Sequence, residues 1–107
     1  MIKVYQIRLT DAEVDAINRG EETEKSKAYF GRSFDRTFKA ENFQHYDHVA
    51  DVFTDDKEEA FSLMNLWNDC SKVTLVDGGC PSMSVGDILE MEDGTKFRCA
   101  SMGFDAI

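Results

Sequence analysis

The fold of this chain is decided near its end, by the stretch Ser82-Met83-Ser84-Val85-Gly86-Asp87-Ile88-Leu89-Glu90-Met91. Asp93-Gly94 follows, and then Lys96-Phe97-Arg98-Cys99. Asp-Gly between two alternating segments is a strong signal of a two-residue hairpin turn, because both residue types tolerate positive φ. We therefore expect two antiparallel strands, near 86–92 and 96–101. The side chains expected to face a core are Ile88, with Leu89 or Met91 as further candidates, on the first arm and Phe97 and Cys99 on the second. Those expected to face water are Glu90, Glu92, Lys96 and Arg98.

Size and composition fit one small domain, residues 1–107. The chain has 107 residues, 42% of them hydrophobic, which suits a single core. No run of eighteen apolar residues occurs, and residues 2–9 alternate with charges where a signal peptide would be unbroken. Three cysteines without a Cys-x-x-Cys pair suit a reducing compartment. We expect a cytoplasmic protein, in the host cell if a phage encodes it, that does not enter a membrane.

Upstream of the hairpin, the chain alternates between strand and helix patterns. Residues 2–9 form an apolar-rich strand pattern whose alternation slips near Tyr5-Gln6, as at a bulge. Thr10 and Glu13 match a capping box, which predicts a helix near 11–19. The polar segment that follows predicts a mobile loop over about 21–32.

The middle of the chain predicts two helices and a second strand. Phe30, Phe34 and Phe38 recur every four residues, which predicts a helix near 33–42. Their spacing fits either rings buried in the core or rings exposed for stacking. A strand is expected near 46–53 and a helix near 56–68, followed by an insert loop over about 70–81 with a short edge strand at 72–76. The predicted fold class is α+β: a small, mostly antiparallel sheet with two or three helices packed on one face and a C-terminal β-hairpin.

The residues that could carry chemistry do not form a strong motif. His45, His48, Cys70 and Cys80 could be assembled into a zinc site, but their spacing lacks close ligand pairs at both ends. A Cys/His nucleophile site would need a lowered thiol pKa, which a sequence does not reveal. Residues 78–79 and 85–87 lack the glycine patterns that hold phosphates. We expect no catalytic residue, metal or cofactor, and keep a small Cys/His enzyme as an alternative.

Charge is distributed unevenly along the chain. The formal net charge of −9 disfavours nucleic acid and anionic membranes as partners and favours a cationic protein. The candidate partner-binding residues are Asp55, Asp56, Glu58 and Glu59, although the dipole of the helix that they begin also explains them. This acidity either keeps the protein soluble or imitates the phosphates of DNA. Between residues 25 and 39 the charge is basic instead, and Arg32, Arg36 and Lys39 are the candidates for an alternative, single-stranded nucleic-acid site.

Residues 46–104 resemble the YodL-like domains and related small proteins of bacteriophages and conjugative elements. The shared pieces are the strand at 46–52, the acidic helix from Asp55, the Ser-Val-Gly-Asp segment at 84–87 and the closing Gly103-Phe104. The resemblance implies a mobile-element accessory protein and no defined reaction. Its matching residues are expected to shape the hairpin, Gly86 by backbone freedom and Asp87 by a side-chain bond to the backbone. The turn residues singled out are Ser82, Gly86, Asp87, Asp93 and Gly94.

From these patterns we expect a non-enzymatic accessory protein. Its expected role is to bind and modulate a host protein, one that handles nucleic acid, through its acidic surface, by DNA mimicry or as an anti-defence factor. The sequence specifies neither the identity of that partner nor the oligomeric state.

Overall fold

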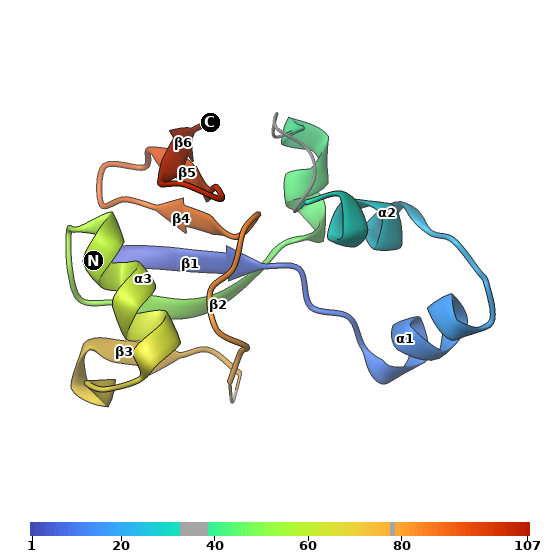
Figure 1. Cartoon of the computed structure of the whole chain (residues 1–107), viewed down its shortest axis with the longest axis horizontal. Coiled ribbons are helices and arrows are strands. Elements are labelled where there is room, and N and C mark those ends of the chain that lie inside the picture. Colours follow the sequence, from blue (N-terminus) through green and yellow to red (C-terminus); the bar gives the residue numbers. More distant parts are fainter. Residues whose placement is uncertain (33–38, 78) are drawn as a thin grey trace.

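A computed structural model describes residues 1–32, 39–77 and 79–107. Its centre is a six-stranded antiparallel sheet in the order β3-β2-β1-β4-β5-β6 (Figure 1). The predicted α+β class is confirmed, including the C-terminal strand pair. The strands are β1 (Ile2–Gln6), β2 (Asp47–Val52), β3 (Val73–Leu75), β4 (Ile88–Glu90), β5 (Lys96–Cys99) and β6 (Phe104–Ala106). The described helices are α1 (Asp11–Asn18), α2 (Glu24–Gly31), α3 (Lys57–Leu66) and the 3-10 helices η1 (Ala40–His45) and η2 (Cys70–Lys72).

The hydrophobic core lies between the sheet and α3. Ile2 and Val4 of the central strand β1 are fully buried, as are Val52 and Leu89 of the neighbouring strands. The buried side chains of α3, the helix expected near 56–68, are Ala60, Leu63 and Met64. Burying a Leu or Met side chain stabilises a fold by about 1.5–3 kcal/mol, so the packing of α3 on the sheet contributes several kcal/mol to stability.

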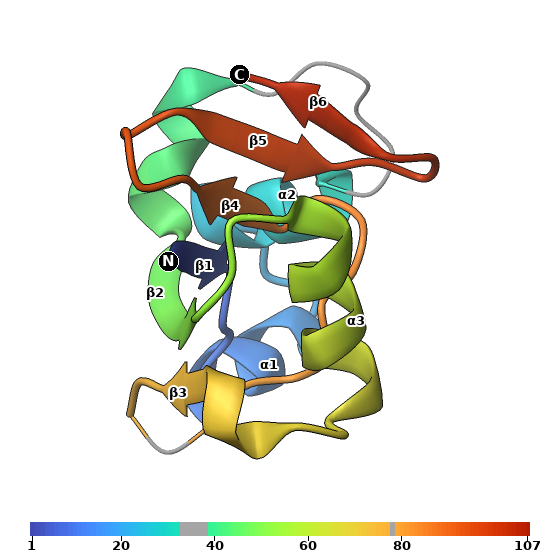
Figure 2. The ribbon, with the colours of Figure 1, turned by 90° about the vertical axis from the view of Figure 1, so that its left-hand side faces the viewer.

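The sheet contains a β-bulge, and the face opposite α3 is covered by η1. Val4 pairs with Ala50 but Tyr5 pairs with His48, so Val49 is an extra residue in β2, close to where the alternation slips in the sequence. The Tyr5 ring lies on the face opposite Val4 and packs against Phe43 of η1, with ring centroids 5.1 Å apart. Figure 2 shows α3 and η1 on opposite sides of the sheet. Most of the helix predicted near 33–42 lies outside the described residues.

The prediction of a mobile loop over 21–32 is wrong, because α2 occupies most of it. Thr23 Oγ1 accepts from Ser26 N at 3.0 Å, and Ser26 Oγ accepts from Thr23 N at 2.9 Å. This reciprocal cap satisfies two amides of the first turn. Ser26 and Ala28 are also buried, so the helix is held by packing as well as by its cap. In contrast, the capping box of Thr10 and Glu13 that predicted α1 is confirmed.

The turn of the C-terminal hairpin lies one residue earlier than predicted. Gly94 N donates to Met91 O at 2.9 Å, so Glu92 and Asp93 occupy the centre of the turn. Gly94 has φ +90°, whereas Asp93 is not among the described residues with positive φ. The loop therefore closes as a type I turn followed by a left-handed glycine, and the two-residue Asp93-Gly94 turn is wrong. The sequence also missed β6 as a strand, while the expected short edge strand is present as β3.

Candidate functional site

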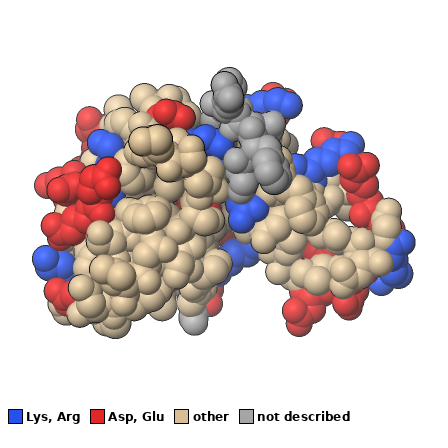
Figure 3. All heavy atoms as spheres, viewed as in Figure 1, with Lys and Arg blue, Asp and Glu red and all other residues tan. Residues whose placement is uncertain are grey.

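Two loops bring exposed carboxylates together at one end of the molecule. The N-terminal ammonium of Met1 lies 3.2 Å from Asp55 Oδ1, which precedes α3, and 3.0 Å from Glu92 Oε2, in the β4–β5 turn. The carboxylates, that of Glu92 first, raise the pKa of this ammonium group. We call this region the acidic end, and define it by five exposed acidic residues: Asp55, Asp56, Glu58, Glu92 and Asp93. Figure 3 shows Asp and Glu side chains gathered at this end, around the start of α3.

The four predicted partner-binding residues do not all have free carboxylates. Asp56 caps α3, because its Oδ1 accepts from Glu58 N at 2.9 Å and from Glu59 N at 3.4 Å. Glu59 Oε1 lies 3.3 Å from Lys72 Nζ. Asp55 and Glu92 share the Met1 ammonium but are 88% and 74% exposed, so they and the exposed Glu58 can still contact a partner. The sequence did not single out Glu92 because it lies on another loop.

An exposed aromatic residue lies close in sequence to Asp55 and Glu58. Phe53, directly after β2 and two residues before Asp55, is 55% exposed. Protein interfaces are enriched in aromatic residues at their centre and are polar at their rim. The acidic end therefore offers an apolar contact as well as charge.

The basic aromatic segment is only partly described. The Arg32 guanidinium lies 4.0 Å from the centre of the Tyr29 ring and donates to Tyr29 O, so it is held against α2. Phe30 is 53% exposed and Lys39 is exposed. Arg36, Phe34 and Phe38 lie outside the described residues.

The cysteines and histidines lie in dissimilar surroundings. Burial raises the pKa of the Cys80 thiol and raises that of Cys99 to about 11, the opposite of what a nucleophilic thiol needs. Cys70 is exposed. His48 Nε2 lies 2.7 Å from Asp51 Oδ1, and His45 ends η1. Within the described ranges, no group of three or more His, Cys, Asp or Glu is arranged to hold a metal ion.

The loop before β4 contains a buried carboxylate, Asp87, which is 2% exposed. Its Oδ2 accepts from Ser84 N at 2.9 Å and from Gln6 Nε2 at 3.0 Å. The bond to Ser84 is of the side-chain-to-backbone kind expected from the sequence. Burial raises the Asp87 pKa to about 6, although both hydrogen bonds and the nearby Arg32 act to lower it. Under neutral conditions this carboxyl is therefore close to its titration range.

Gly86 lets the end of α2 lie directly against this loop. It has φ +94°, and a Cβ there would lie 2.6 Å from Arg32 Cγ and 2.7 Å from Arg32 O. Arg98 Nη2 donates to the same Arg32 carbonyl at 2.6 Å, and Tyr46 Oη donates to Gly86 O at 2.6 Å. Arg98 is only 5% exposed, so the prediction that it faces water is wrong. The prediction failed because Arg98 alternates with apolar residues as in a surface strand, whereas the carbonyl that it binds, Arg32 O, belongs to a distant part of the chain.

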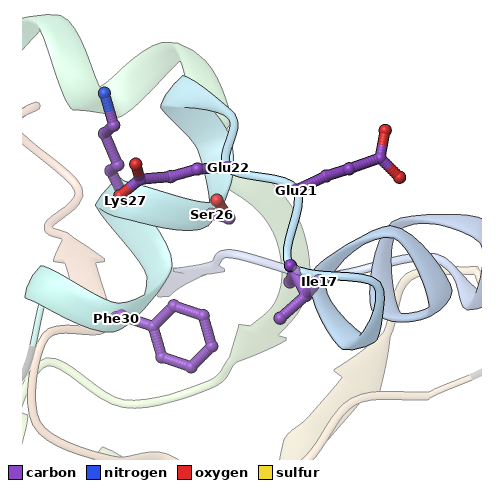
Figure 4. A pocket seen from close by; sticks show the side chains of 7 residues that line it. Ile17, Glu21, Glu22, Ser26, Lys27 and Phe30 are labelled. Carbon is purple, nitrogen blue, oxygen red and sulfur yellow. The ribbon is translucent and has the colours of Figure 1, made fainter.

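Among the hollows that described residues line, two lie next to the helices α1 and α2. One, of about 470 Å³, lies between α1 and α2, where Figure 4 shows Phe30 facing Ile17 and Glu21 pointing away. The other, of about 440 Å³, lies where the end of β1 meets α1, α2 and residues 81–87. We call it the two-arginine pocket, because Arg8 and Arg32 both line it, together with Gln6, Tyr29 and Asp87.

Helices of membrane-spanning length and hydropathy are absent from the part of the chain that the structure describes. The resemblance to YodL-like domains stays a prediction. Comparison of the chain with protein-family models, with curated proteins and with solved structures finds no match.

Proposed function

We propose that this chain is a non-enzymatic accessory protein that binds a protein with a basic surface through the acidic end. The observation that carries the proposal is the convergence of Asp55 and Glu92, from two different loops, on one ammonium group. Their side chains are 88% and 74% exposed, so both remain open to a second cation. The exposed Phe53, two residues before Asp55, is available as an apolar anchor.

Charge complementarity of this kind acts mainly on association rate and on the choice of partner. Positive patches that normally hold nucleic acid are surfaces that complement a cluster of carboxylates. A host protein that handles nucleic acid is therefore the expected partner. The resemblance to small phage and mobile-element proteins supports the same expectation.

The test is affinity capture with two charge-matched variants. One carries Asp55→Asn, Glu58→Gln and Glu92→Gln, which leaves the helix cap of Asp56 intact. The other carries Asp15→Asn, Glu21→Gln and Glu22→Gln, at exposed positions on and after α1. Wild-type protein and both variants are exposed to host lysate, and captured proteins are identified and then purified for direct titration.

The expected result is a partner that binds wild-type protein and the α1 variant but binds the acidic-end variant about tenfold or more weakly, since each lost charge contact is worth about 0.5–1 kcal/mol. Its affinity should also fall with added salt. A partner that both variants weaken equally would show that only net charge matters, and would contradict the proposal.

A further inference from the structure

A second binding site is indicated by the two-arginine pocket, which lies apart from the acidic end. Its volume of about 440 Å³ falls in the range of small-molecule sites, roughly 300–1,000 Å³. Apolar side chains of Ile7, Leu9 and Val14 line it beside a few polar groups. A mostly apolar hollow with convergent polar groups is the usual form of a site for a small organic ligand.

Gln6 supplies an unsatisfied acceptor at this pocket. Its Nε2 donates to Asp87 Oδ2 at 3.0 Å and to Pro81 O at 3.1 Å, which fixes the orientation of the amide. Gln6 is 3% exposed, and its Oε1 has no hydrogen-bond partner among the described residues. Buried polar atoms are nearly always paired, so this unpaired oxygen, on a residue that lines the pocket, is an acceptor that a bound donor would satisfy. A ligand N–H or O–H, or a water held beneath a ligand, would supply it.

The charge of the pocket favours an anion. Arg8 and Arg32 both line it, within a protein whose net charge is −9. Within the described ranges Arg8 forms a long ion pair, with its Nε 3.5 Å from Asp47 Oδ2. Asp87 is the acidic residue that lines the pocket, and with its pKa raised to about 6 it is mostly ionised near pH 7, so it offsets one of the two guanidinium charges and leaves the lining net positive. Guanidinium groups bind carboxylates and phosphates through paired hydrogen bonds.

We propose that the two-arginine pocket binds a small organic anion: an acidic group held by Arg8 and Arg32, joined to a flat apolar body that carries a hydrogen-bond donor for Gln6. The apolar body lies among Ile7, Leu9 and Val14. The proposal does not depend on the protein-binding role of the acidic end.

The test is a titration of the full chain followed by amide resonances in two-dimensional NMR. The probes are indole-3-acetate, with a carboxylate and a ring N–H, and uridine 5′-monophosphate, with a phosphate and a ring N–H. Indole-3-acetamide is the neutral control, and 1-methylindole-3-acetate lacks the donor. At least one of the two anions should shift the amides of residues 6–9, 29–32 and 82–87 saturably below about 10 mM, an affinity reachable by a fragment of this size. Carboxylate or phosphate preference follows from which anion binds more tightly.

Three substitutions separate the site from net charge. Arg8→Gln and Arg32→Gln should each weaken binding about tenfold, the effect of losing one charge-assisted contact. Arg19→Gln, at an exposed position beyond α1, should leave binding unchanged. The spectra themselves report whether each variant folds.

If indole-3-acetamide binds about tenfold more weakly than the acid, the requirement for an anion is supported. If the methylated probe also binds more weakly, the requirement for a hydrogen-bond donor is supported. The proposal is overturned if neither anion gives saturable shifts in these amides. It is also overturned if the neutral amide binds as tightly as the acid, or if Arg19→Gln weakens binding as much as the two pocket variants do.

Discussion

Replacing Gly86 by Ala tests how closely α2 lies against the loop before β4. At φ +94° an alanine is strained by about 1–2 kcal/mol. Its Cβ would in addition lie 2.6 Å from Arg32 Cγ and 2.7 Å from both Arg32 Cβ and Arg32 O. A contact with backbone is not relieved by a rotamer change, and overpacking of this kind costs about 1–3 kcal/mol. We expect Gly86→Ala to lower the free energy of unfolding by about 2–5 kcal/mol.

Gly94→Ala is the matched control, because Gly94 has φ +90° and nothing lies within 4 Å of the added Cβ. It should show the backbone strain alone, about 1–2 kcal/mol. The assay is urea unfolding of the three proteins followed by circular dichroism, with thermal midpoints as a second measure. The difference between the variants should reach about 1–3 kcal/mol, or roughly 4–8 °C in midpoint for each kcal/mol. Equal destabilisation of both would refute the close approach of Arg32 to Gly86.

Three further predictions concern Asp87, α2 and α3. The Asp87 pKa of about 6 lies above its unfolded value, so the folded state binds more protons between pH 4 and pH 6, and this group's contribution to stability is lost as pH rises through that window. Asp87→Asn keeps the acceptor for Ser84 N and Gln6 Nε2. Between pH 4 and pH 7 the unfolding free energy of the wild-type protein should fall by about 2 kcal/mol relative to that of this variant. A constant difference between the two proteins would show that Asp87 titrates normally. Thr23→Ala should cost about 1 kcal/mol and expose the amides of α2 to faster hydrogen exchange, whereas unchanged exchange would mean that the cap does not hold this helix. Met64→Ala should cost about 2–5 kcal/mol in urea unfolding because Met64 is fully buried, and a loss below 1 kcal/mol would contradict the packing of α3 on the sheet.

The elements predictable from the sequence are those whose signal is local. The capping box of Thr10 and Glu13 predicts α1, and the helical spacing of apolar residues such as Ala60, Leu63 and Met64 predicts α3. The helix α2 was missed because its cap ends in Ser26 instead of Glu or Gln, and because it has no apolar stripe. Its stability comes from burial of Ser26 and Ala28, which only the assembled fold provides.

The two-arginine pocket was not predictable for a related reason. Gln6 ends β1, Arg32 follows α2 and Asp87 precedes β4, so their meeting depends on the path of the whole chain. A polar residue at position 6 of an alternating strand carries no sign that it is buried. Asp87 was singled out as a turn residue, but its burial and raised pKa follow from its neighbours and not from its own segment.

Both borders of the sheet are formed by very short strands. Strands β3 and β6 have three residues each, and every longer strand is paired on both sides. A border this short gives an incoming chain few backbone groups to pair with, even though Leu75 in β3 is exposed. Growth of the sheet by addition of further copies is thereby discouraged, and a concentrated solution of the folded protein should stay free of fibrils.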